Sequence, residues 1–392
     1  MQSVSGFEKK FVYFIVFLPI IFGFFSLLKV SIVFPVYTFV VVLLLLYSIY
    51  RKVNISSLVL LALLCIIVAV TIASGGFQYF FNQDVYLFLY LIIIFIFSFS
   101  NKSVGKVLIE NDKVIVISTV CYILLLLISV IFFSGFRQFD EYNNYNVLFG
   151  PYHFSHTCAY DLIFYTILML FYIHNKKRKI SGLLILFSLI VLILLTQVRT
   201  AFLALLFIGI YEIFFSKYLK KKLKIFMIFV LASLFITLII ISFVNVSFLS
   251  NIPFLSKTIE AYEDGNITNG RDTFIKIAIE HFKELPFFNK IFGITVEEVR
   301  NLNFEEIGLK IHCHNDFFTI LLGYGILGLG VFLFSIFAFI KNNYKIPFII
   351  FLSIFIIFNG LYMYWNFCIY LIIIRGIYFE KGDLHEESII YE

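Results

Sequence analysis

The stretch His312-Cys-His-Asn-Asp-Phe-Phe-Thr-Ile-Leu-Leu-Gly-Tyr-Gly-Ile-Leu-Gly-Leu-Gly330 joins a polar loop to a strongly apolar segment. Its first part carries two histidines and an Asn-Asp pair, side chains that can exchange protons or begin a helix. Its second part is apolar and rich in glycine, which is typical of membrane helices that pack closely. The stretch therefore predicts a membrane-spanning helix that begins directly after a group of titratable residues.

The rest of the chain is equally apolar. Of its 392 residues, 61% are apolar and 14% charged, and Phe alone contributes 53, which leaves too little polar surface for a soluble globular domain. A span needs roughly 20 apolar residues, and the chain has about twelve such runs. We predict an all-α fold: a polytopic membrane bundle of about 12 transmembrane helices, with a long extracytoplasmic loop containing amphipathic helices. The predicted spans are 11–28, 32–50, 56–73, 85–100, 114–133, 157–173, 182–196, 200–216, 225–244, 316–340, 346–364 and 366–379.

Basic residues decide the predicted orientation. Of the 30 Lys and Arg residues, 20 lie in short segments on one side of the spans and three in short segments on the other. Short loops rich in Lys and Arg stay in the cytoplasm, so both termini are expected there. Three parts follow: nine spans in 1–244, an extracytoplasmic loop in 245–315, and three spans with a cytoplasmic tail in 316–392. This orientation and anionic lipid explain the net charge of +6 without a nucleic-acid partner.

A short hairpin, Gln197-Val198-Arg199, joins the predicted spans 182–196 and 200–216. Each of these spans has only about 15 residues, so the hairpin should lie recessed in the outer leaflet. An arginine at such a depth is costly unless it faces a polar cavity or an anionic partner. The alternative is that Arg199 extends to the lipid headgroups.

The predicted outer loop contains an amphipathic helix from Asp272 to Leu285. Its apolar residues recur at helical spacing, and Pro286 ends it. This helix should lie on the membrane surface or cap the bundle. The apolar residues are Phe274, Ala278, Phe282 and Leu285.

Cations and imidazoles gather in this loop, where a recessed Arg199 would face them. Guanidinium groups bind phosphate oxygens bidentately, and a neutral imidazole can accept the proton of an attacking hydroxyl. The combination suits a lipid diphosphate substrate, whose good leaving group requires no separate acid. The loop residues concerned are Arg271, Arg300, Lys310, His312 and His314.

Each of these residues also has a purely structural interpretation. Either histidine could be a surface residue or a helix cap, Arg271 a first-turn residue and Arg300 a solvated one. The glycines are most simply a close-packing surface for a neighbouring helix. They stand at positions 323, 325, 328 and 330.

Metal binding and lipid transport are competing interpretations. Two sets of imidazoles and carboxylates could bind zinc, but neither has the spacing of a closed site, so we expect no metal and no cofactor. A lipid-sugar flippase would place charges near mid-membrane in matching halves, and the spans here are almost free of charge and unrepeated. The five cysteines have no paired spacing, and a disulfide between Cys158 and Cys313 is a minor alternative. The two metal sets are His312, His314 and Asp316, and His153, His156 and Asp161.

Several elements occur in an order that resembles the bacterial O-antigen polymerase and ligase family. The resemblance covers Thr196 to Gly330, whereas the first half of the chain is similar in hydropathy alone. The elements are Val198-Arg-Thr-Ala-Phe-Leu-Ala-Leu-Leu206, Gly270-Arg271, Pro286, Gly293, His314-Asn315 and Gly325-Ile-Leu-Gly328.

The resemblance implies an inverting, metal-independent glycosyltransferase that acts on undecaprenyl-diphosphate-linked sugars. It would lie in the bacterial plasma (inner) membrane, with its active site facing the periplasm or exterior. His314 would be the base, Arg199 and Arg271 would engage the diphosphate, and the extra His312 leaves open which imidazole acts. We place Arg300 with the diphosphate-binding residues, and Asn315 and Gln197 beside them as supporting residues.

The leading hypothesis is a polymerase of O-antigen or capsule repeat units. The family pattern of two arginine-rich outer loops is met only in part, because the loop from Arg137 to His156 holds a single arginine. A ligase that hands finished polymer to a lipid or protein acceptor is the alternative. The partners expected are the lipid-linked oligosaccharide, membrane lipid, and a chain-length regulator and flippase of the same pathway.

Overall fold

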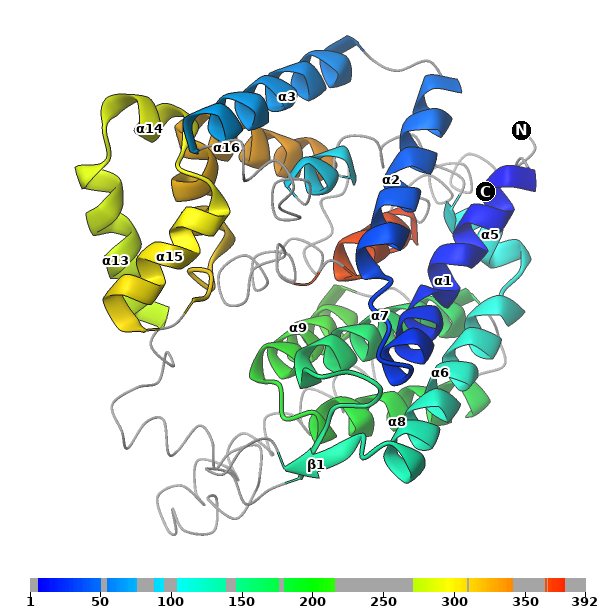
Figure 1. Ribbon diagram of the computed structural model, residues 1–392. Coiled ribbons are helices and arrows are strands. Elements are labelled where there is room, and N and C mark those ends of the chain that lie inside the picture. The colour runs from blue at the N-terminus through cyan, green and yellow to red at the C-terminus, as the bar shows by residue number, and fades with distance from the viewer. Residues whose placement is uncertain are drawn as a thin grey trace. The chain divides into compact units, whose positions relative to one another are not determined.

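The computed structural model describes residues 6–50, 55–75, 88–94, 104–138, 146–175, 180–215, 271–308, 310–340, 364 and 366–377. This part of the chain is almost entirely helical (Figure 1). Its labelled helices are α1 (Gly6–Leu27), α2 (Val33–Tyr50), α3 (Ile55–Gly75), α5 (Val104–Glu110), α6 (Lys113–Phe132), α7 (Ser155–Asn175), α8 (Ile180–Leu195), α9 (Arg199–Phe215), α13 (Arg271–Glu284), α14 (Phe287–Phe292), α15 (Val296–Ile307) and α16 (Asp316–Ile340). Residues 88–94 and 366–377 are also helical.

The apolar helices coincide with predicted spans. Within the described residues, four helices are long and apolar enough to cross a membrane: Gly6–Leu27, Lys113–Phe132, Ser155–Asn175 and Asp316–Phe339. Four more are apolar but shorter: Val33–Leu46, Leu58–Ala73, Ser181–Leu195 and Asn366–Ile377. These helices support a multi-pass membrane protein.

Two predicted spans lie outside the described residues, 225–244 entirely and 346–364 up to its last residue, and 85–100 is described only in part. The count of twelve, the orientation and the three-part division therefore stay predictions.

A pair of short strands was not predicted. β1 (Phe136–Gln138) and β2 (Asn146–Leu148) run antiparallel, with Arg137 opposite Val147. The guanidinium carbon of Arg137 lies 4.5 Å from the centre of the Phe149 ring, a cation–π contact. The single arginine of this loop therefore packs on the Phe149 ring and helps to stabilise the strand pair.

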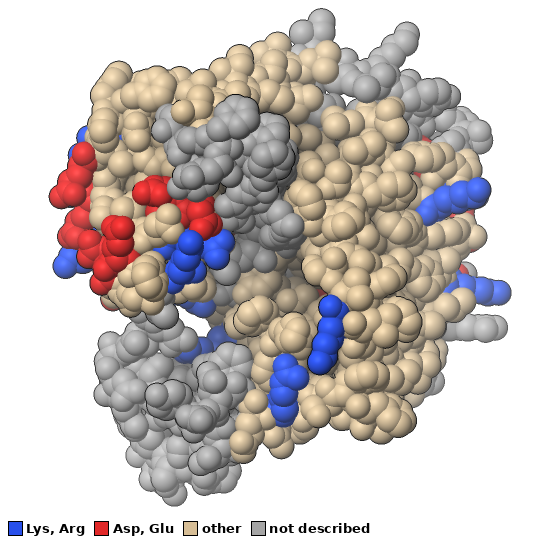
Figure 2. Space-filling view, viewed as in Figure 1, with Lys and Arg blue, Asp and Glu red and all other residues tan. Residues whose placement is uncertain are grey.

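The chain divides into two compact units. The first contains α1 to α5, the start of α6, and α13 to α16, and the second contains the rest of α6, the strands, and α7 to α9. In the first unit an ion pair joins Lys9 to Glu110 at 3.0 Å, and in the second His174 lies 3.0 Å from Glu212. Acidic and basic side chains gather over α13 and α15 on the face shown in Figure 2.

α16 is broken at Gly325, whose φ of 70° and ψ of −171° are not helical. The connection between α14 and α15 lies against this break. The N–H of Ile294 donates to the carbonyl of Leu322 at 2.9 Å, and the N–H of Thr295 donates to that of Gly323 at 3.0 Å. A Cβ on Gly325 would lie 2.2 Å from the carbonyl oxygen of Ile291.

The prediction that the glycines form a close-packing surface is thus confirmed at positions 323 and 325. The partners at these positions belong to neighbouring helices, as predicted: a Cβ at 323 would meet Val296 of α15, and a Cβ at 325 would meet Ile291 and Phe292 of α14. The loop between α14 and α15 adds N–H groups that bond to the carbonyls of Leu322 and Gly323. Among the residues that the structure describes, none comes within 4 Å of a Cβ at Gly330, so these residues do not pack closely there.

Candidate active site

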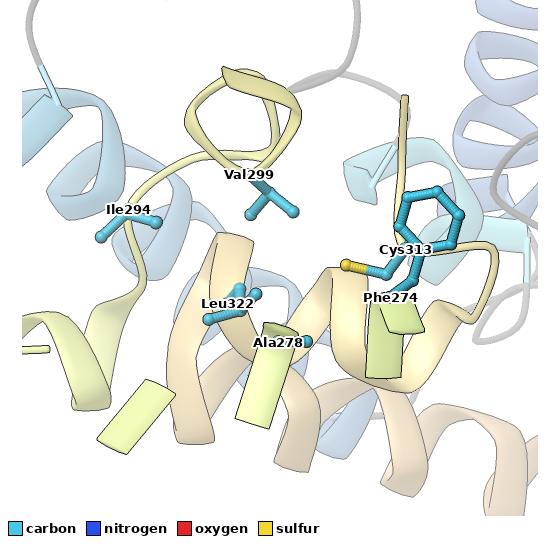
Figure 3. Packing of buried hydrophobic residues seen from close by; sticks show 6 residues of the cluster. All are labelled: Phe274, Ala278, Ile294, Val299, Cys313 and Leu322. Carbon is cyan, nitrogen blue, oxygen red and sulfur yellow. The ribbon is translucent and has the colours of Figure 1, made fainter. Parts of the chain in front are cut away.

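α13 is placed by the apolar face that the sequence predicted. Phe274 and Ala278 are buried, and Phe282 and Leu285 pack partly buried against the same cluster. Because protein covers this face, α13 caps the first unit, one of the two predicted outcomes. The buried members of the cluster, drawn in Figure 3, are Phe274, Ala278, Ile294, Val299, Cys313 and Leu322.

The loop before α16 alternates between buried and partly exposed side chains. Cys313 is buried, while His312 and His314 on either side of it are partly exposed. Burial raises the pKa of the Cys313 thiol to about 11, so this side chain stays protonated at neutral pH. Cys313 therefore serves packing, while both imidazoles keep some exposed surface although protein covers most of each ring. Cys313 and Cys158 are both free, which contradicts the minor alternative of a disulfide between them.

Asn315 begins α16 as its cap. Its Oδ1 accepts hydrogen bonds from the N–H of Phe317 at 2.9 Å and of Phe318 at 3.5 Å. Such caps satisfy the first N–H groups of a helix and are worth about 1 kcal/mol. The supporting role expected for Asn315 therefore has a physical form: it fixes where the helix starts relative to His314.

His314 has a left-handed backbone with a φ of 50°. This backbone conformation is strained for a residue other than glycine, and strained residues occur most often at functional sites. The ring of Phe274 on α13 meets the imidazole edge to face, with 5.6 Å between ring centres. The cap on one side and Phe274 on the other hold His314 in place.

Arg271, the first residue of α13, acts electrostatically on His314. Burial and the Arg271 guanidinium both lower the pKa of the His314 imidazole from its ordinary value of 6.5. The imidazole is therefore neutral at pH 7 and can accept a proton. The structure brings together two residues that lie 43 positions apart in the chain, at 271 and 314.

Replacing Arg271 by glutamine is expected to raise the pKa of His314 toward 6.5, because a charge that disfavours imidazolium is removed. Diethyl pyrocarbonate modifies neutral imidazole, so its rate at His314, followed by mass spectrometry against pH, reports this pKa. The modification should need a higher pH in Arg271→Gln than in the unchanged protein. Arg300→Gln is the matched control, since Arg300 acts on His312 instead. An unchanged titration of His314 in Arg271→Gln would contradict the assignment.

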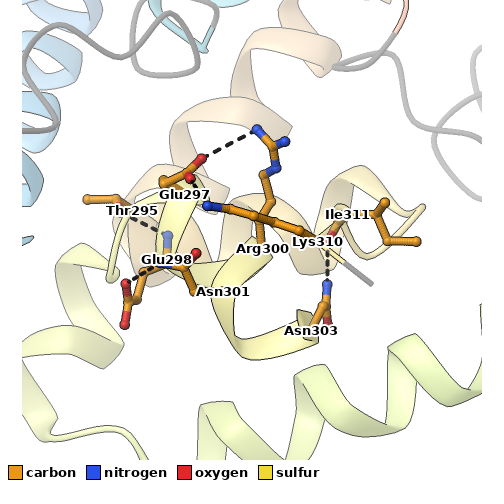
Figure 4. A network of polar contacts seen from close by, with 8 residues as sticks. All are labelled: Thr295, Glu297, Glu298, Arg300, Asn301, Asn303, Lys310 and Ile311. Atoms are coloured by element: carbon orange, nitrogen blue, oxygen red, sulfur yellow. Dashed lines mark hydrogen bonds and ion pairs between the residues drawn. The ribbon is translucent and has the colours of Figure 1, made fainter. Parts of the chain in front are cut away.

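His312 is close to a second group of charges. Burial, Arg300 and His314 lower the pKa of the His312 imidazole to about 4, against the opposing effect of Glu297. Arg300 Nη1 lies 3.3 Å from Glu297 Oε2, and Lys310 Nζ lies 2.7 Å from Glu297 Oε1 (Figure 4). The sequence did not indicate that the acidic segment of α15 pairs with these cations. The three-residue spacing of Glu297 and Arg300 could have indicated their pair, whereas the pairing with Lys310 depends on the fold.

The hairpin of Arg199 belongs to the second unit. α8 ends at Leu195 and α9 begins at Arg199, each one residue before the predicted end at 196 and the predicted start at 200. Gln197 has a φ of 52°, and its Nε2 donates to the carbonyl of Asn146 at 3.2 Å, which ties the hairpin to β2. Beside Arg199, the hydroxyl of Thr200 lies 3.0 Å from that of Tyr160 on α7. The hairpin is thus well held, and its contribution to the site around His314 stays a prediction.

Neither predicted metal set forms a metal-binding cluster, since no three His, Cys, Asp or Glu side chains converge within the described ranges. In the second set, the Asp161 carboxylate is buried and accepts a hydrogen bond from the hydroxyl of Tyr152. In the first, Asp316 is buried in the first turn of α16.

A comparison with protein families bears on the whole region. No curated protein matches the chain. Residues 183–333 match the family model Wzy_C, described as O-antigen ligase, and this range includes the Arg199 hairpin, α13 to α15 and both histidines. Members of that family are membrane enzymes of glycosyl transfer in O-antigen pathways. The resemblance to the O-antigen polymerase and ligase family is thereby confirmed over residues 183–333 of the chain.

Proposed function

We propose that the protein is a polysaccharide repeat-unit polymerase of O-antigen or capsule type. It would transfer glycan from undecaprenyl diphosphate to a sugar hydroxyl of another lipid-linked repeat unit. The observation that carries this proposal is the position of His314 directly before α16, held by its edge-to-face contact with Phe274 of α13, where burial and the charge of Arg271 lower the pKa of the imidazole. A base next to a cation suits the two charges that develop during such a transfer.

In the proposed reaction, His314 accepts the proton of the acceptor hydroxyl as its oxygen attacks the anomeric carbon. The bond from that carbon to the diphosphate breaks, and its electron pair leaves with the diphosphate oxygen. Attack from the face opposite the leaving group inverts the anomeric configuration. Arg271 stabilises the charge of the departing diphosphate, so the reaction needs neither a metal nor a cofactor in this proposal.

The remaining residues have proposed places around this pair. Arg199 would bind the same diphosphate, and Gln197 would support it by holding the hairpin on β2. Arg300 would bind phosphate near His312, and Asn315 would fix the start of α16. The site would face the periplasm or exterior, with both termini in the cytoplasm of the bacterial host.

A ligase is the second candidate, and the description of the matched family as O-antigen ligase favours it. The chemistry at the anomeric carbon is the same, and the acceptor alone differs. A ligase would hand finished polymer to a lipid or protein instead of to another lipid-linked unit.

Deletion of the gene separates the two candidates. Loss of a polymerase leaves single repeat units attached to the final acceptor, whereas loss of a ligase leaves none attached. Gel electrophoresis of the acceptor with carbohydrate staining checks this, and we expect single units. Purified protein in vesicles that moves lipid-linked sugar across the bilayer, without glycosyl transfer, would contradict both candidates in favour of a flippase.

A further inference from the structure

Glu297 sits between two cations and uses one carboxylate oxygen for each. Its Oε2 lies 3.3 Å from Arg300, and its Oε1 lies 2.7 Å from Lys310. The side chain of Glu297 is 19% exposed, against 32% for Arg300 and 49% for Lys310. The anion is thus the most buried member of the trio, and both cations have surface directed toward solvent.

The two cations are held in place by contacts that do not involve Glu297. Asn303 on α15 donates to the carbonyl of Ile311 at 2.7 Å, which fixes the loop that carries Lys310 (Figure 4). The start of α15 is fixed by Thr295, whose hydroxyl accepts a hydrogen bond from the N–H of Glu298 at 3.3 Å. The backbone positions of Arg300 and Lys310 are therefore set independently of the carboxylate between them.

The trio carries one more positive than negative charge. This positive charge affects the His312 imidazole, because Arg300 lowers the pKa of His312 although Glu297 opposes the effect. A doubly charged phosphate group has more acceptor oxygens and more charge than a carboxylate, so it competes well for the same two cations.

We propose that Arg300 and Lys310 form a diphosphate-binding subsite in which Glu297 is an internal counter-ion that the ligand displaces. The subsite consists of other residues than the Arg271 and His314 pair, and it would take the diphosphate of the second lipid-linked unit. The identity of this ligand rests on the proposed polymerase function, whereas the subsite itself rests on the trio. A diphosphate that does not displace the Glu297 carboxylate from Arg300 and Lys310 would then bind weakly to this subsite.

The test is calorimetric titration of the full-length protein, in nanodiscs of zwitterionic lipid, with inorganic pyrophosphate at low salt. Glu297→Gln should bind pyrophosphate about three- to tenfold more tightly than the unchanged protein, because two partly exposed ion pairs no longer compete. The gain should shrink as salt screens the charges. Adding Lys310→Met to Glu297→Gln should remove it.

Glu298→Gln is the matched control. Glu298 lies in the same first turn of α15, and its Oε2 accepts a hydrogen bond from the side-chain amide of Asn301 at 3.1 Å. The variant loses the same charge beside the helix start, so an equal gain in both variants would reflect general electrostatics and overturn the subsite. Unchanged or weaker pyrophosphate binding by Glu297→Gln would also overturn it.

Nanodiscs of anionic lipid distinguish the source of the phosphate. A gain that persists in them supports a diphosphate ligand, and a gain that disappears assigns the site to lipid headgroups and overturns the proposal. The test is also independent of the polymerase assignment. If the deletion strain carries no single repeat units while Glu297→Gln gains affinity, the polymerase function fails and the subsite stands. Single repeat units in the deletion strain with no gain in affinity leave the function and remove the subsite.

Discussion

Chain extension is expected to be lost when His314 is replaced by alanine, while the protein stays inserted in the membrane at normal levels. General base catalysis is typically worth about 10² to 10⁴ in rate, so the variant should yield acceptor with single repeat units. Little destabilisation is expected, because the side chain is partly exposed and contacts Phe274 at its edge. His314→Gln should behave like alanine, since an amide cannot accept the proton. The measurement is the polymer ladder of a complemented deletion strain.

His281 supplies the control for this experiment. It lies in the last turn of α13, and its Nε2 is 3.6 Å from Glu306 Oε1. His281→Ala should therefore retain full-length polymer. A ladder of normal length from His314→Ala would refute the assignment of the base. If His312→Ala loses the polymer instead, the role of base belongs to His312.

The Arg199→Ala variant tests whether the hairpin of the second unit contributes to the proposed reaction. We expect it to lose chain extension as His314→Ala does, because the proposal gives Arg199 the same diphosphate as Arg271. Normal polymer from this variant would limit the site to the first unit, and Arg199 would then be a residue that interacts with lipid headgroups.

Local patterns were sufficient to predict several elements. The period of Phe274, Ala278 and Phe282 predicted both the helix α13 and the face that it buries, because 3.6-residue periodicity is a local property. The hairpin at Gln197 followed from the length of two apolar runs. His314 and Arg271 were chosen from their chemistry and family resemblance, and in the structure the charge of Arg271 lowers the pKa of His314.

Contacts between distant parts of the chain could not be predicted in this way. The shared carboxylate of Glu297 depends on a loop that returns Lys310 to α15, and nothing in the spacing of 297 and 310 indicates it. The docking of the α14–α15 connection on Gly323 and Gly325 likewise depends on tertiary structure. The glycines indicated a close approach, and the identity of the approaching segment required the fold.

The contact between the α14–α15 connection and α16 also supports the residues around the candidate site. The connection bonds to α16 through Ile294 and Thr295, and the hydroxyl of Thr71 on α3 donates to the carbonyl of Phe292 at 2.7 Å. The same connection supplies Ile294 to the cluster that holds Phe274 and Cys313. The cluster around Phe274 and Cys313 is therefore supported by backbone hydrogen bonds that the connection makes to Leu322 and Gly323, next to the break at Gly325.

Gly325→Ala is accordingly expected to be strongly destabilising, although it lies outside the proposed chemistry. The methyl group would meet the carbonyl oxygen of Ile291 at 2.2 Å, and alanine at a φ of 70° adds strain of about 1–2 kcal/mol. Since backbone atoms cannot move aside as side chains do, the total should exceed about 2 kcal/mol. We expect a lower melting temperature in detergent, faster proteolysis between α13 and α15, and loss of chain extension.

Gly330→Ala is the matched control on the same helix. A Cβ at 330 meets no atom of the described part of the chain within 4 Å, so the substitution should be neutral or stabilise α16 by about 0.5–1 kcal/mol through helix propensity. Equal melting temperatures for Gly325→Ala and Gly330→Ala would mean that the connection does not dock at the break. If Gly325→Ala has a normal melting temperature but makes no polymer, the break at Gly325 is needed for the reaction itself. A loss of packing alone would lower the melting temperature and the amount of polymer together.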